Sequence, residues 1–175
     1  MKTVEVVPFE RIGDLVLGID QSSLRNAVGG DFENQPAHVS GGISFPEKDW
    51  FYDHSVSVHY DLQSKLANRV SVGIDSPFKV LFKGLDIFSS EVTQVLSHTH
   101  KYGVLSENDT ELGYSYIFPK LGIDYWRDSI TEDLMADLAN ADEEDEDCIL
   151  EDIEKSKKFQ LVSIFDEAYW TENND

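Results

Sequence analysis

DLVLGIDQSSLRNAVGG, residues 14–30, and KVLFKGLDIFSSEVTQVLSH, residues 79–98, share one pattern. Each contains a glycine, an isoleucine or leucine and an aspartate, followed by two serines and a short apolar stripe. The stripes are Leu24, Ala27 and Val28 in the first segment and Val92, Val95 and Leu96 in the second. The i, i+3, i+4 spacing predicts two equivalent short helices, residues 22–28 and 90–96, the first with a serine cap. The chain is therefore expected to contain a weak internal duplication.

Strand-like sequence follows each predicted helix. In the first half, apolar and polar residues alternate over residues 56–60, and after a turn within residues 63–68 a strand returns through Val70 and Val72. In the second half, LGYSYIFPKLGIDYWRD, residues 112–128, suggests two strands, and the segment KFQLVSIFDEAYW, residues 158–170, suggests a returning strand.

These patterns predict an α+β fold. Two tandem repeats, residues 1–76 and 77–175, each consist of a short helix and an antiparallel β meander, and together they form one compact two-layer unit. The returning strand comes late in the second repeat, so residues 129–156 are expected to be an insertion in a hairpin connection.

The insertion is strongly acidic. Residues 139–155, ANADEEDEDCILEDIEK, contain nine carboxylates before the first lysine. Apolar residues at helical spacing on both sides of the DEEDED run predict two short helices that lie on the sheet, joined by a mobile acidic link. We expect residues 129–139 to be helical and residues 140–147 to be exposed. The alternative is that the run is only a solvated face that keeps the protein soluble.

Net charge is the strongest compositional signal. The 175 residues include 34 acidic and 14 basic side chains, a net charge of −20, and the charge is still −10 without residues 137–154. Phosphate backbones are bound by clustered lysine and arginine, so nucleic acid is not an expected partner, and anionic membranes are not expected either. A basic protein is the expected partner.

Further sequence features point to the cytoplasm. The start, MKTVEVVPFERIG, lacks the apolar region of a secretion signal, and no segment approaches the ~20 apolar residues of a membrane span. Cys148 is the single cysteine, which precludes an internal disulfide or a thiolate metal cluster and is compatible with a reducing compartment.

The search for catalytic and metal-binding motifs gives no site. The five histidines do not form a zinc pattern, the acidic run lacks the central glycine of a calcium loop, and no nucleophile elbow or phosphate-binding loop is present. Gly29-Gly30 and Gly41-Gly42 are interpreted as turn residues. We therefore expect no metal, no cofactor and no enzymatic activity.

Aromatic residues of the predicted strands are either core residues, as most such residues are, or anchors for a protein partner. The expected partner-binding residues are three aromatics and the acidic run. They are Tyr116, Tyr125, Trp126, Asp142, Glu143, Glu144, Asp145, Glu146 and Asp147.

A short helix opened by a Gly-[Ile/Leu]-Asp turn and followed by aromatic antiparallel strands, twice in tandem, resembles the beta-lactamase inhibitor protein and the related small outer-membrane assembly lipoproteins. The resemblance covers residues 12–74 and 79–170. It implies a two-layer α+β architecture whose sheet presents a concave face to another protein. The chain lacks the secretion signal and the cysteines of the secreted relatives, which argues against a beta-lactamase as its target.

In size and charge the chain is also similar to immunity proteins of bacterial polymorphic toxin systems, including contact-dependent growth inhibition. Three functions therefore remain open: an inhibitor of a basic toxin or enzyme, an accessory protein whose charge serves solubility, and an enzyme with an unrecognised site.

Overall fold

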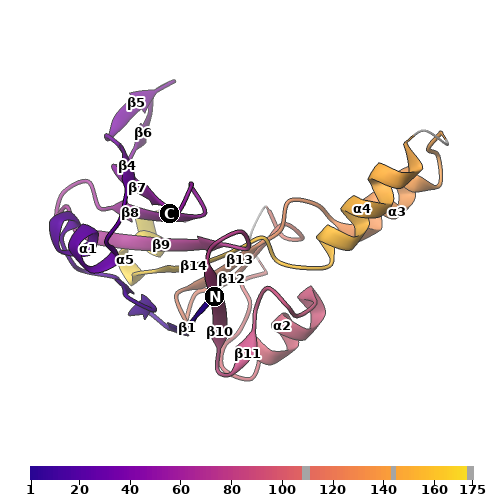
Figure 1. Cartoon of the computed structure of the whole chain (residues 1–175), viewed down its shortest axis with the longest axis horizontal. Coiled ribbons are helices and arrows are strands. Elements are labelled where there is room, and N and C mark those ends of the chain that lie inside the picture. The colour runs from indigo at the N-terminus through magenta and orange to yellow at the C-terminus, as the bar shows by residue number, and fades with distance from the viewer. Residues whose placement is uncertain (108–110, 143–144, 173–175) are drawn as a thin grey trace.

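A computed structural model of the chain describes residues 1–107, 111–142 and 145–172, with side chains up to Tyr169. Its largest element is a seven-stranded sheet with the strand order β12-β13-β14-β9-β8-β7-β4, in which all neighbours are antiparallel (Figure 1). The strands are β4 (Phe32–Gln35), β7 (Lys48–Phe51), β8 (Val56–Tyr60), β9 (Ala67–Gly73), β12 (Ser115–Phe118), β13 (Ile123–Trp126) and β14 (Leu161–Phe165). Because β9 pairs with β14, the meanders of the two halves form one continuous sheet.

A smaller sheet and two helices supply the second layer. The sheet has the order β11-β10-β1-β2-β3, with β1 and β10 parallel. Its strands are β1 (Lys2–Val7), β2 (Arg11–Ile12), β3 (Leu15–Val16), β10 (Phe78–Phe82) and β11 (Leu85–Asp86), and the helices are α1 (Gln21–Val28) and α2 (Val92–Thr99). Leu24 of α1, Val95 of α2 and Val80 of β10 join the large sheet in one buried cluster. The predicted two-layer α+β fold is confirmed.

The duplicated motif makes the same turn in both halves. Asp20 Oδ1 accepts a hydrogen bond from the Ser23 N–H at 3.0 Å, and Asp86 Oδ1 accepts one from the Ser89 N–H at 3.2 Å. Each half then continues into a helix and a meander. Two details of the prediction are wrong: aspartate, rather than serine, caps α1, and α2 begins two residues later than expected, after its N-cap Glu91.

The insertion between β13 and β14 forms a helical hairpin that projects from the body, as Figure 1 shows. It contains α3 (Thr131–Leu138) and α4 (Glu146–Ser156). We call residues 131–156 the acidic arm. No residue of α3 is buried, and the buried residues of α4, Ile153 and Ser156, lie near its C-terminal end, where the arm meets the sheet.

The prediction that these helices lie on the sheet is therefore wrong. The two helices pack against each other, so half-buried Leu134, Leu138 and Ile149 belong to a seam within the arm. Carboxylates are costly to remove from water, and a projecting hairpin keeps them solvated. The expected acidic link is also too long, because Glu146 and Asp147 form the first turn of α4.

A second element projects at the other end of the body. Strands β5 (His38–Ser40) and β6 (Ile43–Phe45) form a two-stranded hairpin beyond the ends of β4 and β7 (Figure 1). Its two-residue loop, Gly41-Gly42, has φ values of 59° and 83°, which two glycines adopt without strain. The interpretation of these glycines as turn residues is confirmed. We call residues 36–46 the neutral hairpin, because they contain no aspartate, glutamate, lysine or arginine.

Candidate functional site

The two faces of the large sheet have different environments. Alternate residues such as Val58, Val70 and Ile164 point into the core with the helices and the small sheet. The opposite side, which we call the open face, carries Trp50, Ser57, His59, Arg69, Ser71, Asp124, Trp126, Leu161 and Ser163. Trp50, Arg69 and Trp126 are partly exposed there. The C-terminal helix α5 (Glu167–Glu172) covers part of this face through Tyr169.

Arg69 is at the centre of a polar network on the open face. Its guanidinium donates to Asp124 Oδ2 at 2.8 Å, to the Tyr169 hydroxyl at 2.7 Å and to Ser163 Oγ at 3.2 Å. Burial disfavours the charge on Arg69, but Asp124 and Tyr169 more than offset this effect and raise its pKa. The network therefore connects β9 of the first half to β13, β14 and α5 of the second.

A surface hollow of about 420 Å³ lies beside this network. It is lined by Arg69, Glu111, Ser115, Ile117, Asp124, Trp126 and Leu161, and we call it the Trp126 hollow. Four residues separate Trp126, the end of β13, from the acidic arm, and four residues separate the arm from Leu161, the start of β14. The hollow is thus at the root of the arm.

The structure separates the three aromatic residues expected at the partner surface. Tyr125 is 0% exposed, its ring stacks on Phe159 at 5.1 Å, and its hydroxyl lies 3.0 Å from Thr99 Oγ1. Burial raises the pKa of Tyr125. The prediction that Tyr125 contacts a partner is therefore wrong. Consecutive strand residues point to opposite faces, so Tyr125 and Trp126 are on different sides of the sheet.

Tyr116 lies opposite Tyr125 on the core side of β12. It is half-buried, its hydroxyl accepts a hydrogen bond from Arg127 Nη2 at 3.1 Å, and its ring meets Phe159 edge-on. Contact between Tyr116 and a partner stays a prediction. Of the three aromatic residues named from the sequence, Trp126 lies on the open face.

The expected acidic residues occupy the outer end of the arm. Asp142, Asp145, Glu146 and Asp147 are exposed, whereas Glu143 and Glu144 fall outside the described residues. Residues 131–156 contain twelve carboxylates and one lysine, a net −11 of the chain's −20. The arm also exposes Met135 and Leu150, with 60% and 47% of their surface accessible.

A buried charged network at the other side of the sheet was not predicted. Asp49 of β7 is 0% exposed and accepts hydrogen bonds from Arg25 at 2.7 and 2.8 Å, from Asn34 at 2.9 Å and from the Tyr60 hydroxyl at 2.8 Å. Burial alone would raise the pKa of Asp49, but these bonds outweigh burial and lower it. The network attaches α1 to the strands below the neutral hairpin.

His59 on the open face is not suited to proton transfer near neutral pH. Burial, followed by the charges of Arg69 and Lys48, lowers its pKa to about 3. Across the described residues, no group of three histidine, cysteine, aspartate or glutamate side chains could hold a metal ion.

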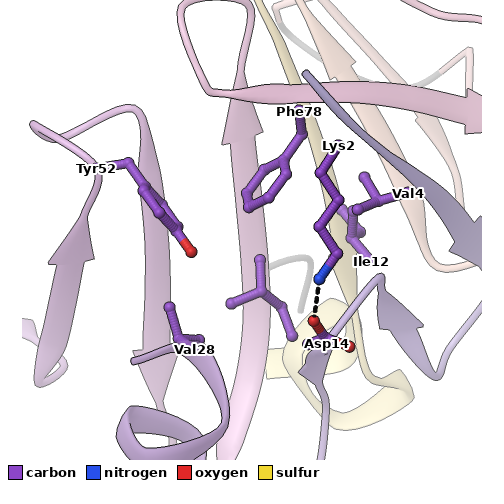
Figure 2. A pocket seen from close by; sticks show the side chains of 8 residues that line it. Lys2, Val4, Ile12, Asp14, Val28, Tyr52 and Phe78 are labelled. Carbon is purple, nitrogen blue, oxygen red and sulfur yellow. Dashed lines mark hydrogen bonds and ion pairs between the residues drawn. The ribbon is translucent and has the colours of Figure 1, made fainter. Parts of the chain in front are cut away.

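A small cavity of about 60 Å³ lies beside β1 (Figure 2). It is lined by Lys2, Val4, Ile12, Asp14, Leu15, Val28, Tyr52 and Phe78. Lys2 and Asp14 form an ion pair at its edge, and both side chains are 61% exposed. The cavity has room for about two water molecules, far below the ~300 Å³ of a small ligand pocket, so it gives no support to the enzyme alternative.

Comparison with known proteins assigns no family. No protein-family description and no curated protein matches the chain. Among solved structures, the crystal structure of the uncharacterized protein yfeY from Escherichia coli matches with a TM-score of 0.47 and 13% identity, over 91% of this chain and 98% of that chain. In the part of the chain that the structure describes, no helix has the length and apolarity needed to cross a membrane.

Proposed function

We propose that the chain is a protein-binding inhibitor in the cytoplasm, and more narrowly an immunity protein that neutralises a basic, nuclease-type bacterial toxin by covering its active site. The supporting observation is the distribution of charge, because residues 131–156 carry a net −11 on an arm that projects from the body. A domain that cuts nucleic acid needs a basic surface for phosphates, and an acidic arm complements that surface.

The shape of the arm strengthens its electrostatic effect. Exposed charges act over about one Debye length, ~8 Å at physiological salt, so a charge on a projecting hairpin meets an approaching protein earlier than a charge on the body. Steering of this kind accelerates association, while desolvated contacts determine the rate of dissociation. The arm is therefore assigned to the encounter with the partner.

The experiment starts with affinity capture of the partner from the native host. The captured protein is then expressed alone and together with this chain. Growth inhibition by the partner alone, relieved by co-expression, is the expected result. A captured protein with an acidic surface and no toxicity would contradict the proposal.

Two variants of equal net charge separate steering from solubility. One replaces Asp142, Asp145, Glu146 and Asp147 on the arm by Asn or Gln, and the other replaces exposed Asp31, Asp53, Asp75 and Glu107 on the body in the same way. In stopped-flow measurements at low salt, the arm variant should associate about tenfold more slowly and with a weaker salt dependence, while the body variant changes little. Equal rates for the two variants would leave only the accessory role, in which the arm serves solubility.

A further inference from the structure

The protein covers several of its aromatic rings with its own cations. Arg25 lies over Phe32, Lys48 over Trp50, Arg69 over Tyr169, Lys83 over Tyr102 and Arg127 over Tyr116, at 4.0 to 6.0 Å from the ring centroids. Such contacts use the negative face of the ring to stabilise the cation. In the described part of the chain, no cation lies over Trp126, although it is partly exposed and Arg127 is its neighbour in sequence.

The lining of the Trp126 hollow suits a side chain with an apolar stem and a positive end. Ile117, Leu161 and the indole of Trp126 give apolar surface, and Glu111 and Asp124 contribute two carboxylates. Among the described residues of the lining, Arg69 is the one basic side chain, and Asp124 pairs with it at 2.8 Å. The charge of the lining therefore favours a cationic guest over an anionic one.

The position of the hollow adds a second reason. Both chain connections between the body and the acidic arm leave from its edge, at Trp126 and Leu161. Acidic residues continue from the outer end of the arm to Glu151, Asp152 and Glu154 near its root, so a basic surface that lies along the arm reaches the hollow. The arm, with a net −11 of the chain's −20, is thus rooted beside an aromatic ring over which no cation of the described residues lies.

We propose that the Trp126 hollow binds an arginine side chain of the protein partner. The guanidinium stacks on the indole and donates to the carboxylates of Glu111 and Asp124, while its methylene groups pack on Ile117 and Leu161. Arginine fits better than lysine because its planar head stacks on an aromatic face and donates in a fork. This inference rests on the proposed function, since it assigns the contact that holds the basic partner after the arm has attracted it.

The test uses the full chain and the peptide acetyl-Gly-Arg-Gly-amide in NMR titrations of the ¹⁵N-labelled protein. A matched peptide with citrulline in place of arginine has the same shape without the charge. The arginine peptide should shift the indole N–H of Trp126 and the backbone amides of Ser115, Ile117 and Leu161 in a saturable way. The citrulline peptide should bind at least about tenfold more weakly.

Three variants locate the binding. Trp126→Leu should abolish the shifts at Ser115 and Ile117, and Glu111→Gln should weaken the binding about threefold. Trp50→Leu is the matched control, because Lys48 already covers that indole at 4.0 Å, and it should bind the peptide as the parent does. Unchanged shifts elsewhere in each spectrum show that the variant is folded.

Equal shifts with the citrulline peptide, or shifts confined to the acidic arm, would overturn the inference. The assay contains no partner protein, so its failure is distinct from failure of the proposed function. If neutralising the arm slows association with the partner but the hollow binds no arginine peptide, only the arginine site is wrong. If the hollow binds the peptide but the arm has no effect on association, the proposed function is wrong and the arginine site stands.

Discussion

The acidic arm and the neutral hairpin are both antiparallel hairpins that leave the body of the protein, yet they expose opposite chemistry. The arm carries twelve carboxylates and one lysine. The hairpin has no charged residue and exposes Val39, Ile43 and Phe45 at 70%, 63% and 41%. Charge acts at a distance and apolar surface acts only on contact. The difference shows that the chain concentrates charge on one projection and an uncharged, largely apolar surface on the other.

The roots of the two elements also differ. Asp49 lies below the neutral hairpin and is paired with the cation Arg25. Arg127, 7% exposed, lies at the root of the arm and donates to neutral oxygens of Gly113, Ser156 and Tyr116 at 2.7, 3.2 and 3.1 Å. A projecting hairpin buries little apolar surface, so buried polar contacts at its root have to fix its direction. The buried charge below the hairpin is therefore held by an opposite charge, whereas Arg127 at the root of the arm donates its hydrogen bonds to neutral oxygens.

The largest loss of stability is predicted for a variant that breaks the ion pair at the root of the hairpin. Asp49→Ala leaves the part-buried Arg25 guanidinium and the buried Tyr60 hydroxyl without their acceptor, and the free energy of unfolding should fall by about 2–4 kcal/mol. Urea unfolding of the parent and the variant measures this. Asp31→Ala, at an exposed position, is the control and should change stability by less than about 0.5 kcal/mol. A loss below about 1 kcal/mol for Asp49→Ala would show that packing alone holds this root.

A smaller effect should appear in acid on the hairpin side of the sheet. His59 of β8 pairs with Lys48 of β7, and its pKa in the folded protein is lowered to about 3, against about 6.5 in the unfolded chain. Below about pH 6.5 the unfolded chain therefore binds a proton that the folded protein does not. Stability should fall as the pH drops from about 6.5 towards 3, by at most about 1.4 kcal/mol per pH unit, and partial exposure of His59 reduces this slope.

Urea unfolding between pH 7 and 4 tests the assignment to His59. His59→Gln should remove this part of the slope, while His54→Gln, at a side chain that is 59% exposed, should keep it. An unchanged slope in His59→Gln would assign the acid sensitivity to other groups.

Much of the fold could be predicted from the sequence because the deciding signals are local. In each half, the Gly-[Ile/Leu]-Asp turn and the apolar stripe after it lie within a few residues of each other. The first stripe lies in helix α1 and the second in helix α2. The long stretch of sequence between the strand that ends at Trp126 and the strand that begins at Leu161 likewise indicates the insertion directly. The arm itself was misplaced, because an apolar stripe shows that a helix has a covered side but not which element covers it.

The candidate site was only partly predictable. Trp126 lies on the open face and its contact with a partner stays a prediction, but Tyr125 beside it is core, an outcome that strict strand alternation could have indicated. Arg69 and Asp124 meet from strands of different halves, 55 residues apart in sequence, and no local pattern links them. The same holds for Asp49 and Arg25, which are 24 residues apart.

The smallest predicted effect asks whether the apolar surface of the neutral hairpin is needed for folding. Val39→Thr with Ile43→Thr keeps β-branched residues in both strands and removes only apolar surface, so the preference for strand structure is preserved. Because 70% and 63% of these side chains are already accessible, the free energy of unfolding should change by less than about 0.5 kcal/mol.

The matched change at the root of the arm is Ile153→Thr, at a residue that is 8% exposed, and it should cost about 1–3 kcal/mol because a hydroxyl replaces buried carbon. Urea unfolding of the variants measures both. A loss above about 1 kcal/mol in the hairpin variant would mean that the hairpin packs against the body in solution, and the contrast with the arm would then be one of burial. Unchanged stability means that folding does not require these apolar side chains, so that the hairpin, unlike the root of the arm, holds apolar surface that is available to the surroundings.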